Sequence, residues 1–175
     1  AGRIITKASL ANAVKFVVAT GGSTNCFIHF SAIAHEIGID AEEMMQAYEE
    51  AGRSIPSIVK VNPASAYDME DFYRAGGVPQ VMKELSGFID ESCLTVTGGT
   101  LGENLAAWTN VFGVDRRVIR TTAEPFSRTG GLAVLRGNLA PASAIAKPLA
   151  MDPSMYLFAG PAHVFNCEEE ATKAV

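Results

Sequence analysis

The hydrophobic pattern of this chain changes near residue 112, and no other feature constrains its fold as strongly. Before that point, apolar residues recur at the spacing of α-helices, and glycine-rich turns separate the periodic stretches. After it, short apolar runs alternate with turn residues, and five of the eight prolines occur, namely Pro125, Pro141, Pro148, Pro153 and Pro161. We therefore expect an α/β part over residues 1–112, followed by a β-rich part over residues 113–175.

Helix boundaries before residue 112 are marked by capping residues and glycines. One helix is expected to begin after Thr6. Another is expected to begin after Asp40, which is followed three residues later by Glu43, and this helix is expected to end at Gly52. Residues 25–37 carry apolar side chains all around the helix, so we expect this helix to be buried on most sides. Further helix starts are expected at Asp68, Pro79, Thr100 and Asn166.

Short runs of β-branched and apolar residues predict strands. Before the boundary, the predicted strands are residues 57–61 and 93–97. Beyond it, they are residues 118–120, 132–136, 144–147, 156–158 and 163–165. Strands at this turn-separated spacing are typical of a barrel or a sandwich.

The overall charge and the cysteine pattern argue against several classes of protein. The chain has 14 Lys and Arg against 19 Asp and Glu, and a net charge of −5 lacks the basic surplus that nucleic-acid binding requires. No apolar stretch approaches the roughly 18 residues of a membrane span, and the N-terminus does not resemble a secretion signal. Cys26, Cys93 and Cys167 form neither a disulfide framework nor a zinc motif, so we expect a reducing, cytoplasmic location.

The turn Gly21–Asn25, at the start of a predicted helix, is the best local candidate for a binding site. Its glycines allow a ligand to approach the backbone, and free amide groups with the helix dipole favour an anion. The candidate contacts are Gly22, Ser23, Thr24 and Asn25. The simpler alternative is a turn with an ordinary Ser/Thr helix cap, and the residues alone favour that alternative.

Positive charge is concentrated beyond the boundary. Residues 113–147 hold six basic and two acidic residues, a charge of +4, which leaves −9 elsewhere in the chain. We favour an electrostatic fit between the two parts over an anion pocket as the explanation. Arg128 and Arg136 bracket Gly130-Gly131, however, so a carboxylate-binding role for these two arginines stays open.

The histidines do not form a metal site. His29 and His35 are six residues apart, a spacing that does not place them on one face of a helix. His163 lies in the other part of the chain. We expect His29, within its apolar helix, to be a hydrogen-bonded core residue rather than a catalytic base.

Five strings in collinear order carry a resemblance to a known family. In sequence letters they are GGSTN at 21–25, MED followed by RAGGVP within 69–79, LTVTG at 94–98, GGLAVLRGNLAP at 130–141 and GPAHVF at 160–165. With these motifs the chain resembles the dihydroxy-acid dehydratase and phosphogluconate dehydratase family, whose other members act on sugar acids. The fourth string is highly specific, and the resemblance covers nearly the whole chain.

The resemblance implies a hydro-lyase that removes water from a 2,3-dihydroxy acid to give a 2-keto acid, with an iron–sulfur cluster and Mg²⁺ as Lewis acids. It implies that residues 1–112 are the helix-rich end of an α/β/α domain and residues 113–175 the start of a β-barrel domain. It also implies a small hydroxy acid as ligand and a homo-oligomeric enzyme. Lys147-Pro148 followed by Asp152-Pro153-Ser154 resembles the sugar-acid branch slightly more than the branched-chain one.

The chain lacks the motifs to which the family's catalytic and metal-binding residues belong. It has no C-D-K motif, and its three cysteines fall where the family does not place cluster ligands. Ser127 is not the family's base, whose motif would lie beyond Val175. No catalytic, cofactor or metal residue is therefore transferred. We expect an inactive central fragment that binds neither the cluster nor Mg²⁺ by itself.

Two other hypotheses belong to different functional classes. In the first, the chain is a non-catalytic module that binds a small anion or a partner protein at the helix N-terminus formed by Gly21–Asn25. This hypothesis predicts stabilisation of the chain by anions. In the second, the chain is an assembly segment, which predicts an oligomer whose formation depends on concentration.

Overall fold

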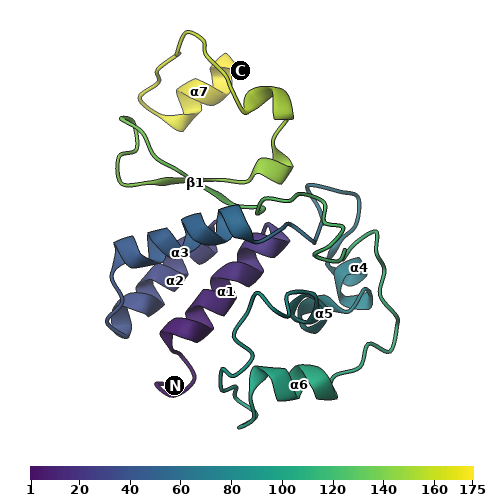
Figure 1. The fold of residues 1–175 in the computed structure, drawn as a ribbon. Coiled ribbons are helices and arrows are strands. Elements are labelled where there is room, and N and C mark those ends of the chain that lie inside the picture. The colour runs from purple at the N-terminus through teal and green to yellow at the C-terminus, as the bar shows by residue number, and fades with distance from the viewer.

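The computed structural model describes all 175 residues, and most of its regular secondary structure is helical (Figure 1). Six helices occupy the first part of the chain: α1 (Lys7–Thr20), α2 (Asn25–Glu36), α3 (Ala41–Ser54), α4 (Met69–Arg74), α5 (Gly77–Glu84) and α6 (Leu101–Ala107). The second part contains β1 (Ala133–Leu135), β2 (Ala144–Ala146), 3₁₀ turns at Pro148–Ala150 and Pro153–Met155, and α7 (Glu168–Ala174). None of these helices is long and apolar enough to cross a membrane.

Local capping explains why the helices begin where they do. The side chain of Thr6 accepts a hydrogen bond from the Ser9 amide, and the Ser9 side chain accepts one from Thr6, so both residues cap α1. Asp40 caps α3 by accepting a bond from the Glu43 amide at 2.8 Å. Thr100 and Glu103 form the reciprocal box at α6. The helix starts predicted at Thr6, Asp40 and Thr100 are thus confirmed.

One hydrophobic core joins the two parts of the chain. Helices α1, α2 and α3 pack against one another, with α4, α5 and α6 beyond α1 (Figure 1). The core contains fully buried residues of α1 and α3, such as Val14 and Tyr48. Val118, Ile119 and Leu132 belong to the same cluster, although they follow residue 112. The residues just after the change in sequence pattern therefore stabilise the helical part directly.

The sheet is smaller than the sequence predicts. Strands β1 and β2 pair antiparallel, with Val134 opposite Ile145, and this two-stranded sheet does not close into a barrel. The predicted strands at 57–61 and 118–120 are wrong in extent, because these segments form one isolated bridge, Val59 to Ile119, within an irregular set of backbone bonds. Residues 93–97 likewise form a single bridge, from Leu94 to Thr100.

The strands predicted at residues 156–158 and 163–165 are absent. No backbone partner lies beside either segment, and a strand without a paired neighbour is not stable in water. Residues 151–170 are exposed throughout, and Figure 1 shows this segment and α7 apart from the helical body. Leu157, which is 94% exposed, and its neighbours therefore have no core to enter in this structure.

Three further expectations are corrected by packing. Helix α2 contacts α1 and α3 on one side only, so Ala34 is its sole buried residue and His29 is an exposed residue, not a core one. Helix α3 continues through Gly52 to Ser54, and Gly52 serves close packing instead of ending the helix, since a Cβ there would lie 3.0 Å from the Leu132 carbonyl oxygen. Cys167, rather than Asn166, is the residue before α7, and its side chain makes no capping bond.

Candidate functional site

The turn Gly21–Asn25 connects α1 to α2 and satisfies much of its own backbone. Gly21 ends α1 in the left-handed conformation, with φ of 57°, which favours glycine. The Ser23 hydroxyl accepts a hydrogen bond from the Asn25 amide at 3.2 Å, while the Thr24 side chain makes no capping bond. The turn of the simpler alternative is therefore present, although no Ser or Thr side chain caps α2, and a ligand role needs support from beyond the turn.

That support comes from a cleft of about 470 Å³ beside the turn. Gly21, Gly22, Ser23 and Thr24 line one side of it. Phe16 and Thr20 of α1 extend this side, and residues far away in the sequence complete the cleft, namely Val59, Val61, Asn62, Met69, Phe72, Val78 and Lys147. The cleft falls within the size range of small-molecule sites, and apolar side chains with a few polar groups line it, as is usual for such sites.

A close glycine contact brings the second part of the chain to this cleft. The Gly131 amide donates a hydrogen bond to the Val18 carbonyl at 2.8 Å, at the end of α1. A Cβ atom at Gly131 would lie only 2.5 Å from the Gly21 Cα atom, so no other residue fits without a shift of the backbone. The chain then forms the β1–β2 hairpin, and Lys147 follows β2 directly. Gly130-Gly131 thus serves packing, and through packing it positions Lys147.

Lys147 is the only charged residue that lines the cleft. Its side chain takes part in no hydrogen bond or ion pair in the structure, although the residue is half-buried. The hydroxyl groups of Ser23 and Thr24 and the amide of Asn62 are further polar groups on the lining. A lone cation with hydroxyl and amide groups around it suits an anionic ligand.

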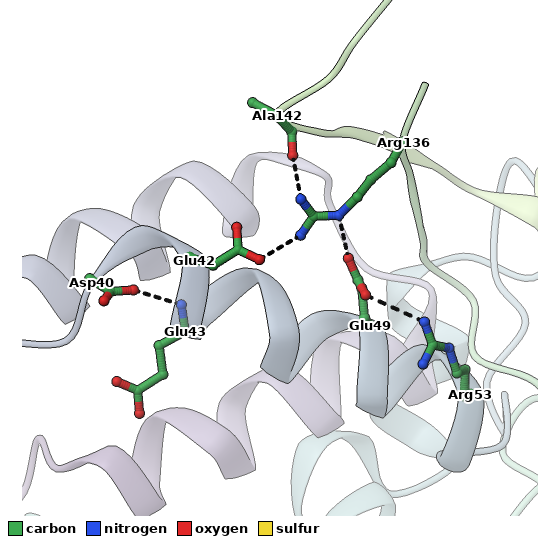
Figure 2. Close-up of polar contacts among 7 residues, drawn as sticks. All are labelled: Asp40, Glu42, Glu43, Glu49, Arg53, Arg136 and Ala142. Carbon is green, nitrogen blue, oxygen red and sulfur yellow. Dashed lines mark hydrogen bonds and ion pairs between the residues drawn. The ribbon is translucent and has the colours of Figure 1, made fainter. Parts of the chain in front are cut away.

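The other predicted contacts lie outside the cleft. Asn25 is exposed and does not line it. Arg128 is also exposed and makes no polar contact. Arg136 is held by carboxylates of α3, since its Nε atom lies 2.7 Å from Glu49 and its Nη2 atom 3.0 Å from Glu42 (Figure 2).

Arg136 connects the hairpin to α3, and its guanidinium group is already bound by carboxylates of the chain itself. It also donates to the Ala142 carbonyl at 3.1 Å, so its guanidinium binds both the loop after β1 and the carboxylates of α3 (Figure 2). Hydrogen bonds to Glu49 and then Glu42 raise the pKa of Arg136. Arg116 pairs with Glu84 at 2.7 Å in a similar way. These pairs confirm the predicted electrostatic fit between the positive stretch and the acidic remainder.

Replacing Arg136 with methionine is expected to lower the thermal unfolding midpoint. The variant keeps an unbranched side chain but leaves Glu42 and Glu49 without their shared cation. Arg128→Met is the control, because it removes the same charge from a residue without polar contacts. Melting curves at low and high salt should separate the two variants most clearly at low salt, because salt screens exposed ion pairs. Equal midpoints for Arg136→Met and Arg128→Met at low salt would show that the bridge contributes nothing.

The residues present do not fit a metal centre. No group of three or more His, Cys, Asp or Glu side chains lies close enough together to hold a metal ion. Cys26 and Cys93 are half-buried and Cys167 is exposed, and all three are free thiols. Burial raises the pKa of the Cys93 thiol, with the nearby Asp90 carboxylate as a second cause, so this group is a poor thiolate ligand.

Sequence reasoning missed Lys147 and Asn62 as cleft residues. The sequence places Lys147 in the positive stretch and in the resemblance to the sugar-acid branch, and Asn62 directly follows the predicted strand at residues 57–61. Both meet the turn Gly21–Asn25 through contacts that span a long stretch of sequence. The glycine pair Gly130-Gly131 was the one signal of such a contact, because paired glycines allow two backbones to approach closely.

Comparisons with known proteins cover both parts of the chain. A family model described as the N-terminal part of dihydroxy-acid/6-phosphogluconate dehydratase matches residues 1–104, and the corresponding C-terminal model matches residues 117–175. The chain is similar to proteins named dihydroxy-acid dehydratase from Dinoroseobacter shibae, at 47% identity, Moorella thermoacetica, at 46%, and Halothermothrix orenii, at 43%. Each alignment covers 98% of this chain but only 30% or 31% of the relative.

Proposed function

The chain belongs to the dihydroxy-acid/6-phosphogluconate dehydratase family, and from this premise we propose that the whole protein removes water from a 2,3-dihydroxy acid to give a 2-keto acid. The observation that carries this proposal is the match of both family models over a chain that contains a cleft with one unpaired cation. The cleft offers a positive charge to a carboxylate and an apolar surface to a short carbon chain. The family match does not favour a purely non-catalytic module.

We propose that the 175 residues form the central portion of this enzyme and are inactive alone. The chain spans about 30% of the length of the curated relatives that it matches. The proposed division into residues 1–112, from the N-terminal domain, and 113–175, from the C-terminal one, is supported by the gap between the two matched ranges. In the whole enzyme, the β1–β2 hairpin and the exposed segment after it would begin the barrel.

The role of this chain in the reaction is to bind and orient the acid. Dehydration breaks the C2–H bond and the C3–O bond, and the resulting enol becomes the 2-keto acid by proton transfer. An iron–sulfur cluster and Mg²⁺ would supply Lewis acidity in the whole enzyme. The residues of this chain do not fit either group, so no catalytic step is assigned to them. They bind the carboxylate and pack against the carbon chain.

The lining of the cleft supports a branched aliphatic acid over a sugar acid as the substrate. Six apolar side chains line it, namely Phe16, Val59, Val61, Met69, Phe72 and Val78. A sugar acid would place several hydroxyl groups against this surface, where they would lose hydrogen bonds to water without replacement. The slight resemblance of residues 147–154 to the sugar-acid branch is thus outweighed by the cleft. We also propose a cytoplasmic homo-oligomer, as family resemblance implies.

An assay of the whole protein, purified without oxygen with its metals, tests this proposal. The expected result is formation of a 2-keto acid from 2,3-dihydroxy-3-methylbutanoate, with much slower turnover of a sugar acid such as gluconate. The 175-residue chain alone, treated in the same way, should form none. A whole protein that releases no 2-keto acid from either substrate would overturn the proposal, and preference for gluconate would overturn the choice of substrate.

A further inference from the structure

The two ends of the cleft differ in chemical character, as the neighbouring cavities show. Lys147, Thr20, Gly21 and Asn62 also line a small adjoining cavity of about 30 Å³. Lys60 is the second charged residue on that cavity, so both charges at this end are positive. Met69, Phe72 and Val78 instead line a second, largely apolar cleft of about 490 Å³. The part of the site that adjoins the small cavity therefore contains the cation, whereas the part that adjoins the second cleft is apolar.

Lys147 is held in place by the backbone around it. Pro148 follows directly and restricts the chain, and residues Pro148–Ala150 form a 3₁₀ turn. The Tyr156 hydroxyl donates a hydrogen bond to the Pro148 carbonyl at 2.8 Å. The Leu149 side chain lies near Gly21, since a Cβ atom added at Gly21 would be 4.0 Å from the Leu149 Cδ1 atom. The lysine stem thus starts from a fixed position beside the turn Gly21–Asn25.

The missing partner of Lys147 points to a ligand. Of the other basic side chains of the positive stretch, Arg116, Arg117 and Arg136 each bind a carboxylate, whereas Arg120 and Arg128 bind none but are exposed to water. Lys147 has no such partner, although it is half-buried and no acidic residue lines the cleft. A half-buried ammonium group gains most from a charged hydrogen-bond acceptor that enters the site.

We propose that Lys147 is the residue that binds the ligand's carboxylate and so orients the acid, with its branched carbon end toward Met69, Phe72 and Val78. This inference rests on the proposed function for the identity of the acid. It assigns Lys147 a ligand-binding role, since the side chain contacts the carboxylate and takes no part in breaking bonds. The selectivity that results is for a charged acid over a neutral molecule of the same shape.

Calorimetric binding of two matched probes to the 175-residue chain tests the inference. The probes are 2-hydroxy-3-methylbutanoate and its uncharged amide, which share size and shape. The wild-type chain should bind the acid about 10- to 100-fold more tightly than the amide, as expected for one charge-assisted hydrogen bond. Lys147→Met should abolish this preference, and Lys147→Arg should retain most of it. Lys173→Met, which removes one charge from exposed α7, should behave as the wild type.

Each outcome bears on the inference separately from the proposed function. Equal affinity of the wild type for acid and amide, absence of acid binding, or unchanged preference in Lys147→Met would overturn the role of Lys147. In the whole protein, Lys147→Met should raise KM for the dihydroxy acid more than it lowers kcat, and Lys147→Arg should restore KM. Acid binding that depends on Lys147, in a protein without dehydratase activity, would refute the proposed function and leave the binding site intact.

Discussion

Replacing Gly131 with alanine is expected to destabilise the chain by at least about 3 kcal/mol and to close the cleft to ligands. The added methyl group would lie 2.5 Å from the Gly21 Cα atom, 2.8 Å from the Gly21 nitrogen and 2.9 Å from the Ser57 hydroxyl. Two of these three atoms belong to the backbone, which moves only if the end of α1 moves. Denaturant unfolding of the variant and the wild type measures the loss.

Gly137→Ala is the matched control, because it lies in the same GGLAVLRGNLAP string and a Cβ there meets nothing within 4 Å. Its φ angle is not positive, so alanine adopts the same backbone conformation without strain. The control should retain wild-type stability within about 0.5 kcal/mol. If Gly131→Ala were as stable as Gly137→Ala, the close contact between Gly21 and Gly131 would not exist in solution.

The second large effect is expected at Asn12, which holds the loop before α6 against α1. Its side-chain amide donates to the Asp90 carbonyl at 2.8 Å, and its carbonyl oxygen accepts from the Asp90 amide at 2.8 Å. Asn12 is only 4% exposed, so Asn12→Ala leaves both Asp90 groups facing a cavity. We expect a loss of roughly 2 kcal/mol, measured by denaturant unfolding, together with faster amide exchange in the loop at residues 88–93.

Asn138→Ala tests whether this loss is specific. Asn138 is exposed and its side chain makes no hydrogen bond, so its replacement should change the unfolding free energy by less than about 0.5 kcal/mol. Equal stabilities of Asn12→Ala and Asn138→Ala would contradict the paired bonds to Asp90. A stability loss without faster exchange at residues 88–93 would place the effect elsewhere.

The helices were predictable because their signals are local. Thr6, Asp40 and Thr100 bond to amide groups three residues away, so the sequence itself contains both partners. The burial of α2 was not predictable in this way. Its apolar side chains fit a buried helix, but the structure covers only one side of α2 and leaves Ile28 67% exposed. Periodicity identifies a helix and its apolar faces, and it does not supply the partners that cover them.

The strands and the cleft depend on contacts across the chain. Residues 57–61 have the composition of a strand, yet their backbone bonds reach residues 118–127 at irregular intervals, and only isolated bridges form. Lys147 reaches Gly21 because Gly131 fits against the end of α1. The family resemblance identified both glycine motifs, but no local rule shows that the two pairs touch. Asn62 and Lys147 were missed for the same reason.

A crystal structure of the chain with bound 2-hydroxy-3-methylbutanoate tests the central claim most directly. We predict a carboxylate oxygen about 2.7–2.9 Å from the Lys147 Nζ atom, the distance of a charge-assisted hydrogen bond. The branched end of the acid should lie against Phe72 and Val78. Binding of the acid away from Lys147, for instance at exposed Arg128, with the cleft filled by water, would contradict the account.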